Sequence, residues 1–389
     1  MRVLVLNSGS SSIKYRLFRI ESMEVMRAGI VDRIGEPGSS AVRDHGEGFG
    51  RVMADLSDSG TIGDPAGLFG IGHRVVHGGE RFREPVRVDH GTLDAIRAMI
   101  PFAPLHNPGN LQGIEVALAT CPGVPQVAVF DTAFHQTMPP RAFHYALPRH
   151  LYDAHRVRRY GFHGTSHAHV ARRAAELLGK PPASLNLITL HLGNGASAAA
   201  IREGKSVDTS MGMTPLEGLI MGTRCGDLDP AVPFFRGAAT GKDPGEIQTL
   251  LNEESGLKGI CGENDMREVH RKSAAGDPSA DLAIDMYSYR IRKYIGAYTA
   301  VLGRVDALVF TGGIGENDAE VRRRACDGLS LLGIAVDEAG NGSPSREPRE
   351  IQRGGMPVKV LVIPTDEELE IALQTVACIR DDVGPEEPR

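Results

Sequence analysis

Apolar and polar positions at the start of the chain follow the pattern of a β-hairpin. Val3–Leu6 is a short apolar run, and Ile13–Phe18 alternates between apolar and polar residues. Between these segments, Asn7–Ser12 contains only small polar residues and glycine, as turns do. A strand, a tight turn and an alternating strand in this order predict a hairpin.

The same order of patterns returns in the middle of the chain. Leu187–Leu192 is apolar, Gly193–Ala196 is a turn of small residues, and Ser197–Ile201 continues as a strand. Gly193 lies 184 positions after Gly9. A recurrence of this kind predicts a duplicated domain.

A second pair of segments favours the same duplication. Val127–Phe134 and Ala307–Gly315 each form an apolar strand that ends in a turn, at a similar offset along the chain. A chain of 389 residues is also long for one hydrophobic core. We therefore expect two domains.

Segments with helical periodicity lie between the predicted strands. They are residues 107–120, with Asn107 as a candidate N-cap, and residues 166–178, 281–302 and 317–332. Strands mixed with helices predict an α/β protein. Glu368–Arg380 is a further helical segment after the second β-rich half, and we expect it to pack back on the first domain.

Composition and charge argue against several classes of partner. The formal charge is −6, from 43 basic and 49 acidic residues, and no Lys/Arg cluster could follow a nucleic acid or an anionic lipid surface. The apolar run before Asn7 is too short for a signal peptide or a membrane span. The five cysteines lack the spacing of a zinc site or a disulfide framework. We expect a cytoplasmic protein with reduced thiols that binds neither nucleic acid nor membranes.

Three turns are candidates for binding phosphate. Asn7–Ser12, followed by Lys14, offers backbone N–H groups, hydroxyls and an ammonium group. A serine-rich hairpin turn is the alternative interpretation, and the spacing is not that of a P-loop. His191–Ser197 and Gly312–Asn317 contain glycines that let the backbone approach an anion closely. The last of these turns follows an apolar strand and opens a helix, which favours phosphate further.

Motifs along the whole chain resemble those of the acetate kinase, or acetokinase, family. In order they are NSGSSSIK, GHRVVHGG, VFDTAFH, RYGFHGTSH, HLGNGAS, GTRCGDLDP, FTGGIGEN and PTDEEL, and with the first strand they cover residues 3 to about 369. The resemblance implies an α/β fold of two duplicated actin-like (ribonuclease H-like) domains with a nucleotide cleft between them. It implies a first domain of residues 1–148 plus 369–389, a nucleotide-binding second domain of residues 149–368, and a homodimer.

The resemblance also implies a reaction, the direct in-line transfer of the γ-phosphoryl group of ATP to acetate, which gives acetyl phosphate and ADP. Arg74 is implied to bind the acetate carboxylate, a task that suits a planar guanidinium. Arg224 and His163 are implied to stabilise the phosphoryl group in flight. Asn7 and Glu367 are implied to hold Mg²⁺, with Mn²⁺ as an alternative.

The other expected site residues come from the same motifs. Asp131 is implied as a catalytic carboxylate, and we expect it to orient the metal or an arginine, because acetate is already ionised at pH 7 and needs no base. The expected ATP contacts are Ser10, Ser12, Lys14, His191, Leu192, Gly193, Asn194, Gly195, Asp265, Met266, Arg267, Gly313, Ile314, Gly315, Glu316 and Asn317. The expected apolar wall around the acetate methyl group consists of Val76, Leu105, Phe162 and Pro215, for which plain core packing is an equal alternative.

Two other functions remain open at this point. A propionate or butyrate kinase would use the same polar residues with a wider apolar pocket. A non-catalytic, ATP-gated clamp of the actin-like type would keep the fold, because fold does not fix function. Such a clamp would not need Arg74, Asp131 and Arg224 together.

Overall fold

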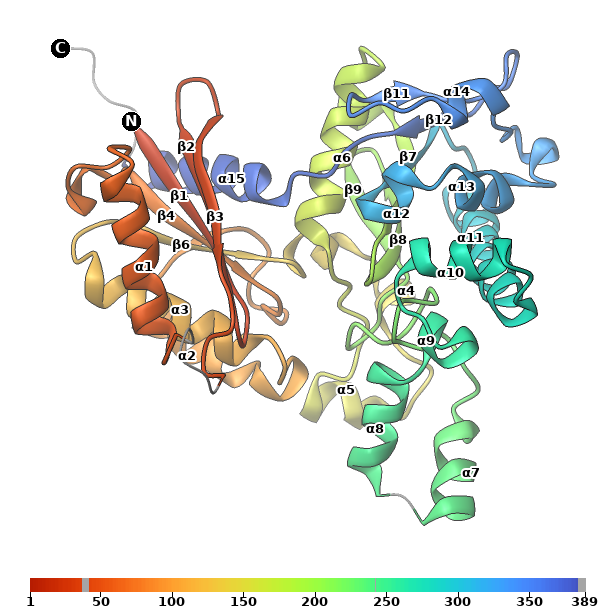
Figure 1. Ribbon diagram of the computed structural model, residues 1–389, viewed down its shortest axis with the longest axis horizontal. Coiled ribbons are helices and arrows are strands. Elements are labelled where there is room, and N and C mark those ends of the chain that lie inside the picture. Colours follow the sequence, from red (N-terminus) through yellow and green to blue (C-terminus); the bar gives the residue numbers. More distant parts are fainter. Residues whose placement is uncertain (37–41, 242, 384–389) are drawn as a thin grey trace. The chain divides into compact units, whose positions relative to one another are not determined.

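The computed structural model describes residues 1–36, 42–241 and 243–383. The chain folds into two compact units, of which the first is Met1–Gln136 with Asp366–Arg389 and the second is Thr137–Thr365 (Figure 1). The domain boundaries expected at residues 148/149 and 368/369 stay a prediction. Residues 384–389 of the expected first domain lie outside the described residues.

The first unit contains a six-stranded sheet in the order β3-β2-β1-β4-β6-β5. Its strands are β1 (Arg2–Ser8), β2 (Ile13–Arg19), β3 (Glu24–Val31), β4 (Gly70–Val75), β5 (Val86–Arg87) and β6 (Gln126–Phe130). Its helices are α1 (His45–Asp58), α2 (His90–Ala98), α3 (Asn107–Thr120) and α15 (Glu367–Val383). β1 pairs antiparallel with β2, so the predicted first hairpin is confirmed.

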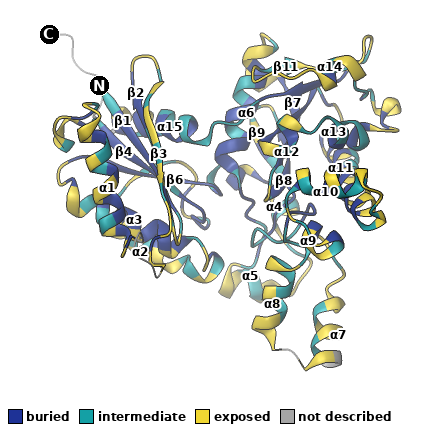
Figure 2. Ribbon diagram, viewed as in Figure 1, coloured by how far each residue is buried: buried dark blue, intermediate teal, exposed yellow. Residues whose placement is uncertain are grey.

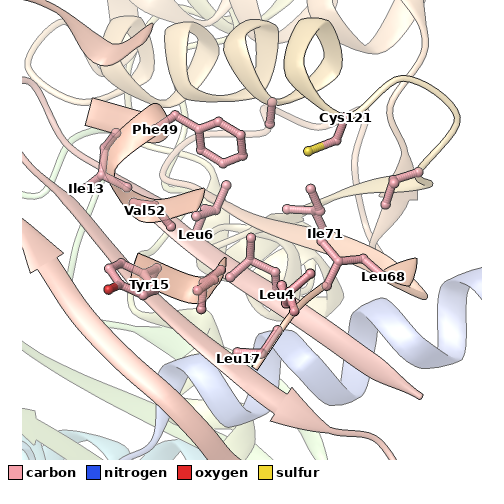
Figure 3. Packing of buried hydrophobic residues seen from close by; sticks show 14 of the residues in the cluster. Leu4, Leu6, Ile13, Tyr15, Leu17, Phe49, Val52, Leu68, Ile71 and Cys121 are labelled. Atoms are coloured by element: carbon pink, nitrogen blue, oxygen red, sulfur yellow. The ribbon is translucent and has the colours of Figure 1, made fainter. Parts of the chain in front are cut away.

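The central strand β1 is apolar on both faces because helices cover both sides of the sheet. Leu4 and Leu6 pack with Phe49 of α1 in a cluster that α3 also joins (Figure 3). Val3 and Val5 point the other way and pack against α15. The expectation that the terminal helix returns to the first domain is therefore confirmed.

The second unit contains another six-stranded sheet, in the order β11-β12-β10-β7-β8-β9. Its strands are β7 (Asn186–Leu192), β8 (Ala196–Arg202), β9 (Lys205–Thr209), β10 (Ala307–Thr311), β11 (Arg349–Glu350) and β12 (Lys359–Val362). Its helices are α4 (Pro140–Phe143), α5 (Arg149–His155), α6 (Gly164–Leu177), α7 (Ala231–Thr240), α8 (Pro244–Glu253), α9 (Gly256–Cys261), α10 (Met266–Ala274), α11 (Pro278–Leu302), α12 (Gly312–Asn317), α13 (Ala319–Cys326) and α14 (Glu338–Gly342). β7 and β8 pair antiparallel, which confirms the second predicted hairpin.

The two sheets have the same topology. Each sheet begins with an antiparallel meander of three strands. The first strand of the meander, β1 or β7, is also the first of three parallel strands, and a short antiparallel strand forms the far edge. β1 therefore corresponds to β7, β4 to β10 and β6 to β12. The second sequence match was wrong in its pairing, because it aligned β6 with β10. Any buried parallel strand reads as a short apolar run, so the pattern alone could not assign the partner.

The predicted helices are present, with two corrections. His106 is the N-cap of α3, and the Asn107 side chain accepts a hydrogen bond from His77 N instead of capping the helix. The segment 317–332 is not one helix, because Asp318 leaves the helical conformation (ψ 92°) and caps α13 through Val321 N. A side-chain oxygen that accepts an N–H at the start of a helix competes with continuation of the preceding one.

Burial follows the sheets in both units. Figure 2 shows the central strands of each sheet buried and the outer faces of the helices exposed. Among the described residues, no helix combines the length and the apolar character needed to cross a membrane.

His73 in β4 gives the first unit a pH-dependent stability. The ring is buried, its Nε2 lies 2.6 Å from Gln126 Oε1, and burial lowers its pKa to about 4. The unfolded chain takes up this proton near pH 6.5, so stability is complete above that value and falls as the pH drops toward 4. We expect a loss of about 2 kcal/mol between pH 7 and pH 5.

The measurement is the opening free energy of β4 and β6 amides by hydrogen exchange in wild type and in His73→Gln. Glutamine keeps a donor for Gln126 but does not titrate, so the variant should lose clearly less stability between pH 7 and pH 5. Equal losses in both proteins would show that His73 is not the titrating group.

Candidate active site

An arginine held by two carboxylates forms the centre of the candidate site in the first unit. Arg74 Nη2 lies 2.7 Å from Asp131 Oδ2 and 3.3 Å from Glu367 Oε2, and Arg74 Nε donates to both Asp131 oxygens at 3.1 and 3.2 Å. Burial lowers the pKa of Arg74, but the Asp131 and Glu367 carboxylates outweigh it, so the net shift is upward. Arg74 is therefore a permanent cation. Its Nη1 group makes no hydrogen bond within the described part of the chain and can receive an anion.

Strand register brings these residues together. Leu6 pairs with His73 and Val75 pairs with Phe130, so Asn7, Arg74 and Asp131 all come at the carboxyl ends of neighbouring parallel strands. Glu367 is the first residue of α15, which packs on the same sheet. Parallel strands end at one edge of a sheet, and that is why four expected residues far apart in sequence gather there.

Oxygen ligands at this edge suit a hard divalent cation. Asp131 and Glu367 supply carboxylates, and Asn7 supplies an amide oxygen on a half-buried side chain. Mg²⁺ prefers one or two carboxylates and keeps several waters, so this donor set fits it. No cluster of three His, Cys, Asp or Glu ligands occurs among the described residues. The site thus fits a cation that shares its coordination with substrate.

The serine-rich turn between β1 and β2 is held by its carbonyl groups. Asn110 Nδ2 donates to Ser8 O at 2.6 Å, and His45 Nε2 lies 2.7 Å from Gly9 O. Within the turn Ser8 is buried, Ser12 is half-buried and Ser10 is exposed, and Lys14 of β2 is exposed. The ATP contacts expected in this turn and at Lys14 remain predictions.

The expected acetate wall is divided between the two units. In the first, Val76 is buried directly after β4, while Leu105 is 58% exposed. In the second, Phe162 is buried next to His163, and Pro215 is half-buried with its carbonyl 3.4 Å from Arg224 Nη1. All four roles remain predictions.

A chain of hydrogen bonds fixes His163 in the second unit. His163 Nδ1 lies 2.9 Å from Ser197 Oγ, Ser197 Oγ lies 2.8 Å from His167 Nε2, and His167 Nδ1 lies 2.7 Å from Thr189 Oγ1. The His163 ring also stacks on His191 at 4.2 Å between centroids. Both contacts orient His163, whose backbone is left-handed at φ 58°.

Arg224 differs from Arg74 because it has no carboxylate partner. Its Nη1 group reaches only Pro215 O at 3.4 Å and Met221 Sδ at 4.0 Å, and no ion pair forms within the described residues. Burial lowers its pKa. A guanidinium in a partly buried place without a counterion favours binding of an anion.

Gly195 brings the two cationic side chains of the second unit to one place. A Cβ atom at this position would lie 3.4 Å from His163 Nε2 and 3.8 Å from Arg224 Nη1. The two nitrogens therefore face the same small space beside the turn after β7. An oxyanion in that space could receive hydrogen bonds from both.

A cavity of about 810 Å³ lies in the second unit and has the size of a nucleotide site. Many of the expected ATP contacts line it, namely Gly193, Asn194, Asp265, Met266, Arg267, Gly313, Ile314 and Asn317. The spacing of residues 265–267 did not indicate how they could belong to a binding site. In the structure, Asp265 caps α10 and binds the Arg267 side chain beside the cavity. These residues therefore form one wall of the cavity.

Four expected ATP contacts of the second unit, besides Gly195, are not among the residues that line the cavity. His191 and Leu192 are buried at the end of β7, and Gly315 is buried in α12. Glu316 Oε1 accepts from Gly312 N at 2.9 Å and from Thr365 N at 3.0 Å. A carboxylate therefore occupies the Gly312 N–H group, which belongs to a turn that was expected to bind phosphate. Gly312 itself has φ 77° and would place a Cβ 2.7 Å from Leu192 O, which explains the glycine.

Several site residues were missed by sequence reasoning. His167, Ser197 and Thr189 support His163, while Ser166 lies 2.7 Å from both His191 Nδ1 and Thr365 Oγ1. Asn264, His270, Asp318, Ala319 and Glu320 add to the lining of the large cavity. The spacing of His163 and His167, four residues apart at the start of α6, was the one available signal for the supporting network.

Fold and site together define a phosphotransferase of the actin-like class: two copies of one sheet topology, a nucleotide-sized cavity lined by Gly193 and Gly313, and an arginine that pairs with no carboxylate among the described residues. Comparison with known sequences and structures narrows the class to a family. The acetokinase family matches residues 2–373, and the chain belongs to it. The resemblance inferred from the motifs and the predicted fold class are thereby confirmed.

Named relatives agree with this assignment. The acetate kinase of Syntrophobacter fumaroxidans is 56% identical over 400 residues, covering 98% of this chain and 97% of the relative. The crystal structure of Porphyromonas gingivalis acetate kinase matches with a TM-score of 0.93 at 42% identity, covering 97% of this chain and all of that one. A propionate kinase from Francisella tularensis matches with a TM-score of 0.90 at 40% identity, covering 96% and 98%.

Gly195→Ala tests whether the space beside His163 and Arg224 is used in turnover. The added methyl makes only ordinary contacts, so the melting temperature should stay unchanged. Because it intrudes between the two nitrogens, phosphoryl transfer should slow by about 100-fold. Gly296→Ala, in α11 of the same unit, where an added Cβ meets nothing within 4 Å, is the control. Full activity in Gly195→Ala would exclude this space as the place of reaction.

Proposed function

We propose that the protein catalyses the reversible transfer of the γ-phosphoryl group of ATP to acetate, which yields acetyl phosphate and ADP. The observation that carries the proposal is the half-buried Arg224, without a carboxylate partner among the described residues and beside His163. Membership of the acetokinase family and the names of the relatives support it. Phosphoryl transfer needs positioned positive charge more than covalent chemistry, and these two side chains supply it.

ATP binding is assigned to the second unit. In the proposal the adenosine part occupies the 810 Å³ cavity, whose wall includes Asp265–Arg267 and Gly313. The turn after β7 directs the triphosphate toward Gly195, where Arg224 and His163 donate to the oxygens of the transferring group. The two donors act most strongly when charge spreads over these oxygens, so they lower the barrier rather than tighten substrate binding.

Acetate binding is assigned to the first unit. Arg74 would receive the carboxylate on the side that Asp131 does not occupy, and Val76 would contact the methyl group. Asp131 keeps the guanidinium in place and needs no proton transfer, because the acceptor is already a carboxylate. The proposed attack is direct and in line, with Arg74 supplied by the first unit and Arg224 by the second.

A divalent cation, Mg²⁺ or alternatively Mn²⁺, is part of the proposal. Asn7 and Glu367 would hold it, directly or through water, and Asp131 would orient its waters. When bound, the cation would neutralise charge on the phosphate oxygens. We further propose a homodimer in the cytoplasm.

Propionate kinase is the second candidate, favoured by the match to the Francisella tularensis structure. One assay separates the possibilities, in which hydroxylamine traps the acyl phosphate formed from ATP and acetate, propionate or butyrate. We expect acetate to give the highest kcat/KM. A preference for propionate or butyrate would reassign the substrate, and no acyl phosphate with any of the three acids would leave only the non-catalytic clamp.

Arg224→Ala should lose kcat rather than substrate affinity. A group that acts mainly on the transition state leaves ground-state binding largely intact, and removal of phosphoryl-transfer arginines costs about 1000-fold or more. Steady-state kinetics with ATP and acetate provide the measurement. Arg290→Ala, an arginine of the same unit bound to Gly218 O, serves as the control for general damage. A raised KM for ATP with kcat retained would remove Arg224 from this role.

Val76→Ala should shift the chain-length preference toward propionate. Removing two methyl groups makes room for roughly one methylene, which is worth about 1 to 3 kcal/mol in an apolar pocket. The ratio of kcat/KM for propionate to that for acetate should rise while kcat for acetate changes little. Val75→Ala, which empties the neighbouring core position beside Phe82, is the control. If the ratio stays constant in a folded Val76→Ala protein, Val76 serves only in core packing.

A further inference from the structure

A second polar cavity lies in the same unit as the nucleotide-sized one. It has a volume of about 440 Å³ and is lined by residues of α12, α13, α14 and the segment that leads into β11. Three arginines line it, namely Arg322, Arg346 and Arg349. Nothing in the proposed reaction uses these residues.

Arg322 is fully buried and holds the local structure through neutral groups. Its Nε donates to Asn341 Oδ1 at 2.7 Å, its Nη2 to Asn341 O at 2.7 Å and its Nη1 to Gly315 O at 2.9 Å. It forms no ion pair with a carboxylate anywhere in the described ranges. Burial, followed by the nearby Arg349 guanidinium, lowers its pKa to about 10. The positive charge at this wall of the cavity is thus uncompensated by direct contact.

The positive charge of Arg349 is also not compensated by an ion pair among the described residues. Its Nη1 donates to Ser345 O at 3.0 Å, while its Nε is buried without a hydrogen-bond partner among the described residues. Glu316 lines the cavity and attracts Arg349, but the two form no ion pair, since Glu316 accepts from Gly312 N and Thr365 N. The lining carries three arginines and one carboxylate, and Asp318 next to the lining also attracts Arg322, so positive charge still exceeds negative charge at the cavity.

We propose that this cavity binds a dianionic phosphate, either inorganic phosphate or the phosphate of a small metabolite. A phosphate monoester carries about −1.5 to −2 at pH 7, which is opposite in sign to the excess charge of the lining. The Arg349 guanidinium, through nitrogens other than its buried Nε, and the exposed Arg346 side chain would donate to the phosphate oxygens, since guanidinium groups suit phosphate geometry. The volume admits the phosphate together with a short organic chain.

This site is built to influence the nucleotide cavity, a consequence that rests on the proposed function. Asn317 and Ala319 line both cavities, so the two cavities are separated by little more than α12. Arg322 holds Gly315 of that helix. A bound dianion would offset the repulsion between Arg349 and Arg322, and Arg322 would hold α12 in place through Gly315. Nucleotide binding should therefore tighten.

Calorimetric titration with inorganic phosphate, and separately with glycerol 3-phosphate, tests the site directly at constant ionic strength. We expect binding to weaken by about 10- to 100-fold in Arg349→Gln, which loses a charged donor. Arg353→Gln removes the same charge from an exposed arginine nearby and should bind as wild type does. Arg224→Gln removes an anion contact of the candidate active site and should also retain this binding.

The outcomes separate the proposal from its alternatives. Loss of binding in Arg349→Gln alone supports the cavity, and weaker binding of inorganic phosphate than of glycerol 3-phosphate would point to a phosphorylated metabolite. Binding that is lost only in Arg224→Gln, or that survives in every variant, would overturn the site. Arg346→Gln, an exposed substitution with little risk to folding, gives a second independent test.

The coupling has its own measurement. The dissociation constant of ADP should fall about fivefold or more when glycerol 3-phosphate is present, in wild type and in Arg353→Gln but not in Arg349→Gln. An unchanged constant in wild type would disprove the coupling. A constant that rises equally in wild type and Arg349→Gln would indicate competition within the nucleotide cavity and would equally count against it.

Discussion

Parallel strands impose the constraint on which both candidate sites depend. In each sheet three neighbouring strands run in the same direction, so their carboxyl ends meet at one edge. In the first unit this edge carries Arg74 and Asp131, 2.7 Å apart. In the second, the corresponding strands lead into His191, Gly312 and Thr365. The duplication thus repeats one edge with different side chains, an arginine paired with a carboxylate in one copy and glycines with an imidazole in the other.

Arg74 in the first unit and Arg224 in the second are both partly buried cations, but their charges are compensated differently. Arg74 is held by Asp131 and Glu367, so its charge is stable and its orientation fixed before any ligand binds. Arg224 has neutral neighbours, and its pKa is lowered by burial. An anion recovers that cost only when it arrives, which makes Arg224 responsive to charge that appears during reaction.

Local patterns in the sequence predicted local structure well. Both hairpins and most helices follow from apolar spacing, because neighbours in sequence decide these features. Long-range pairing did not follow. β4 and β10 occupy the same place in the two sheets, yet GIGHRV and ALVFT share no pattern, so the match to β6 looked equally good. The motifs identified Arg74, Asp131 and Glu367 individually, whereas their contact depends on strand register and on a helix from the far end of the chain.

The hydrogen bonds that hold the His163 ring could not be predicted from the sequence, and they decide which ring nitrogen can donate. Ser197 Oγ carries one proton and contacts a nitrogen of His163 and a nitrogen of His167. For neutral His163 to donate from Nε2 to a phosphoryl oxygen, its Nδ1 must accept from Ser197.

Ser197 must in turn accept from His167 Nε2, and His167 Nδ1 must accept from the Thr189 hydroxyl. Each step uses one donor and one acceptor, so the buried chain can set the required tautomer of His163 without adding a net charge. Fixing the ring this way also offsets the left-handed backbone at His163, which costs about 1 to 2 kcal/mol in a non-glycine residue. The hydroxyls of β7 and β8 thereby determine which histidine nitrogen faces the substrate.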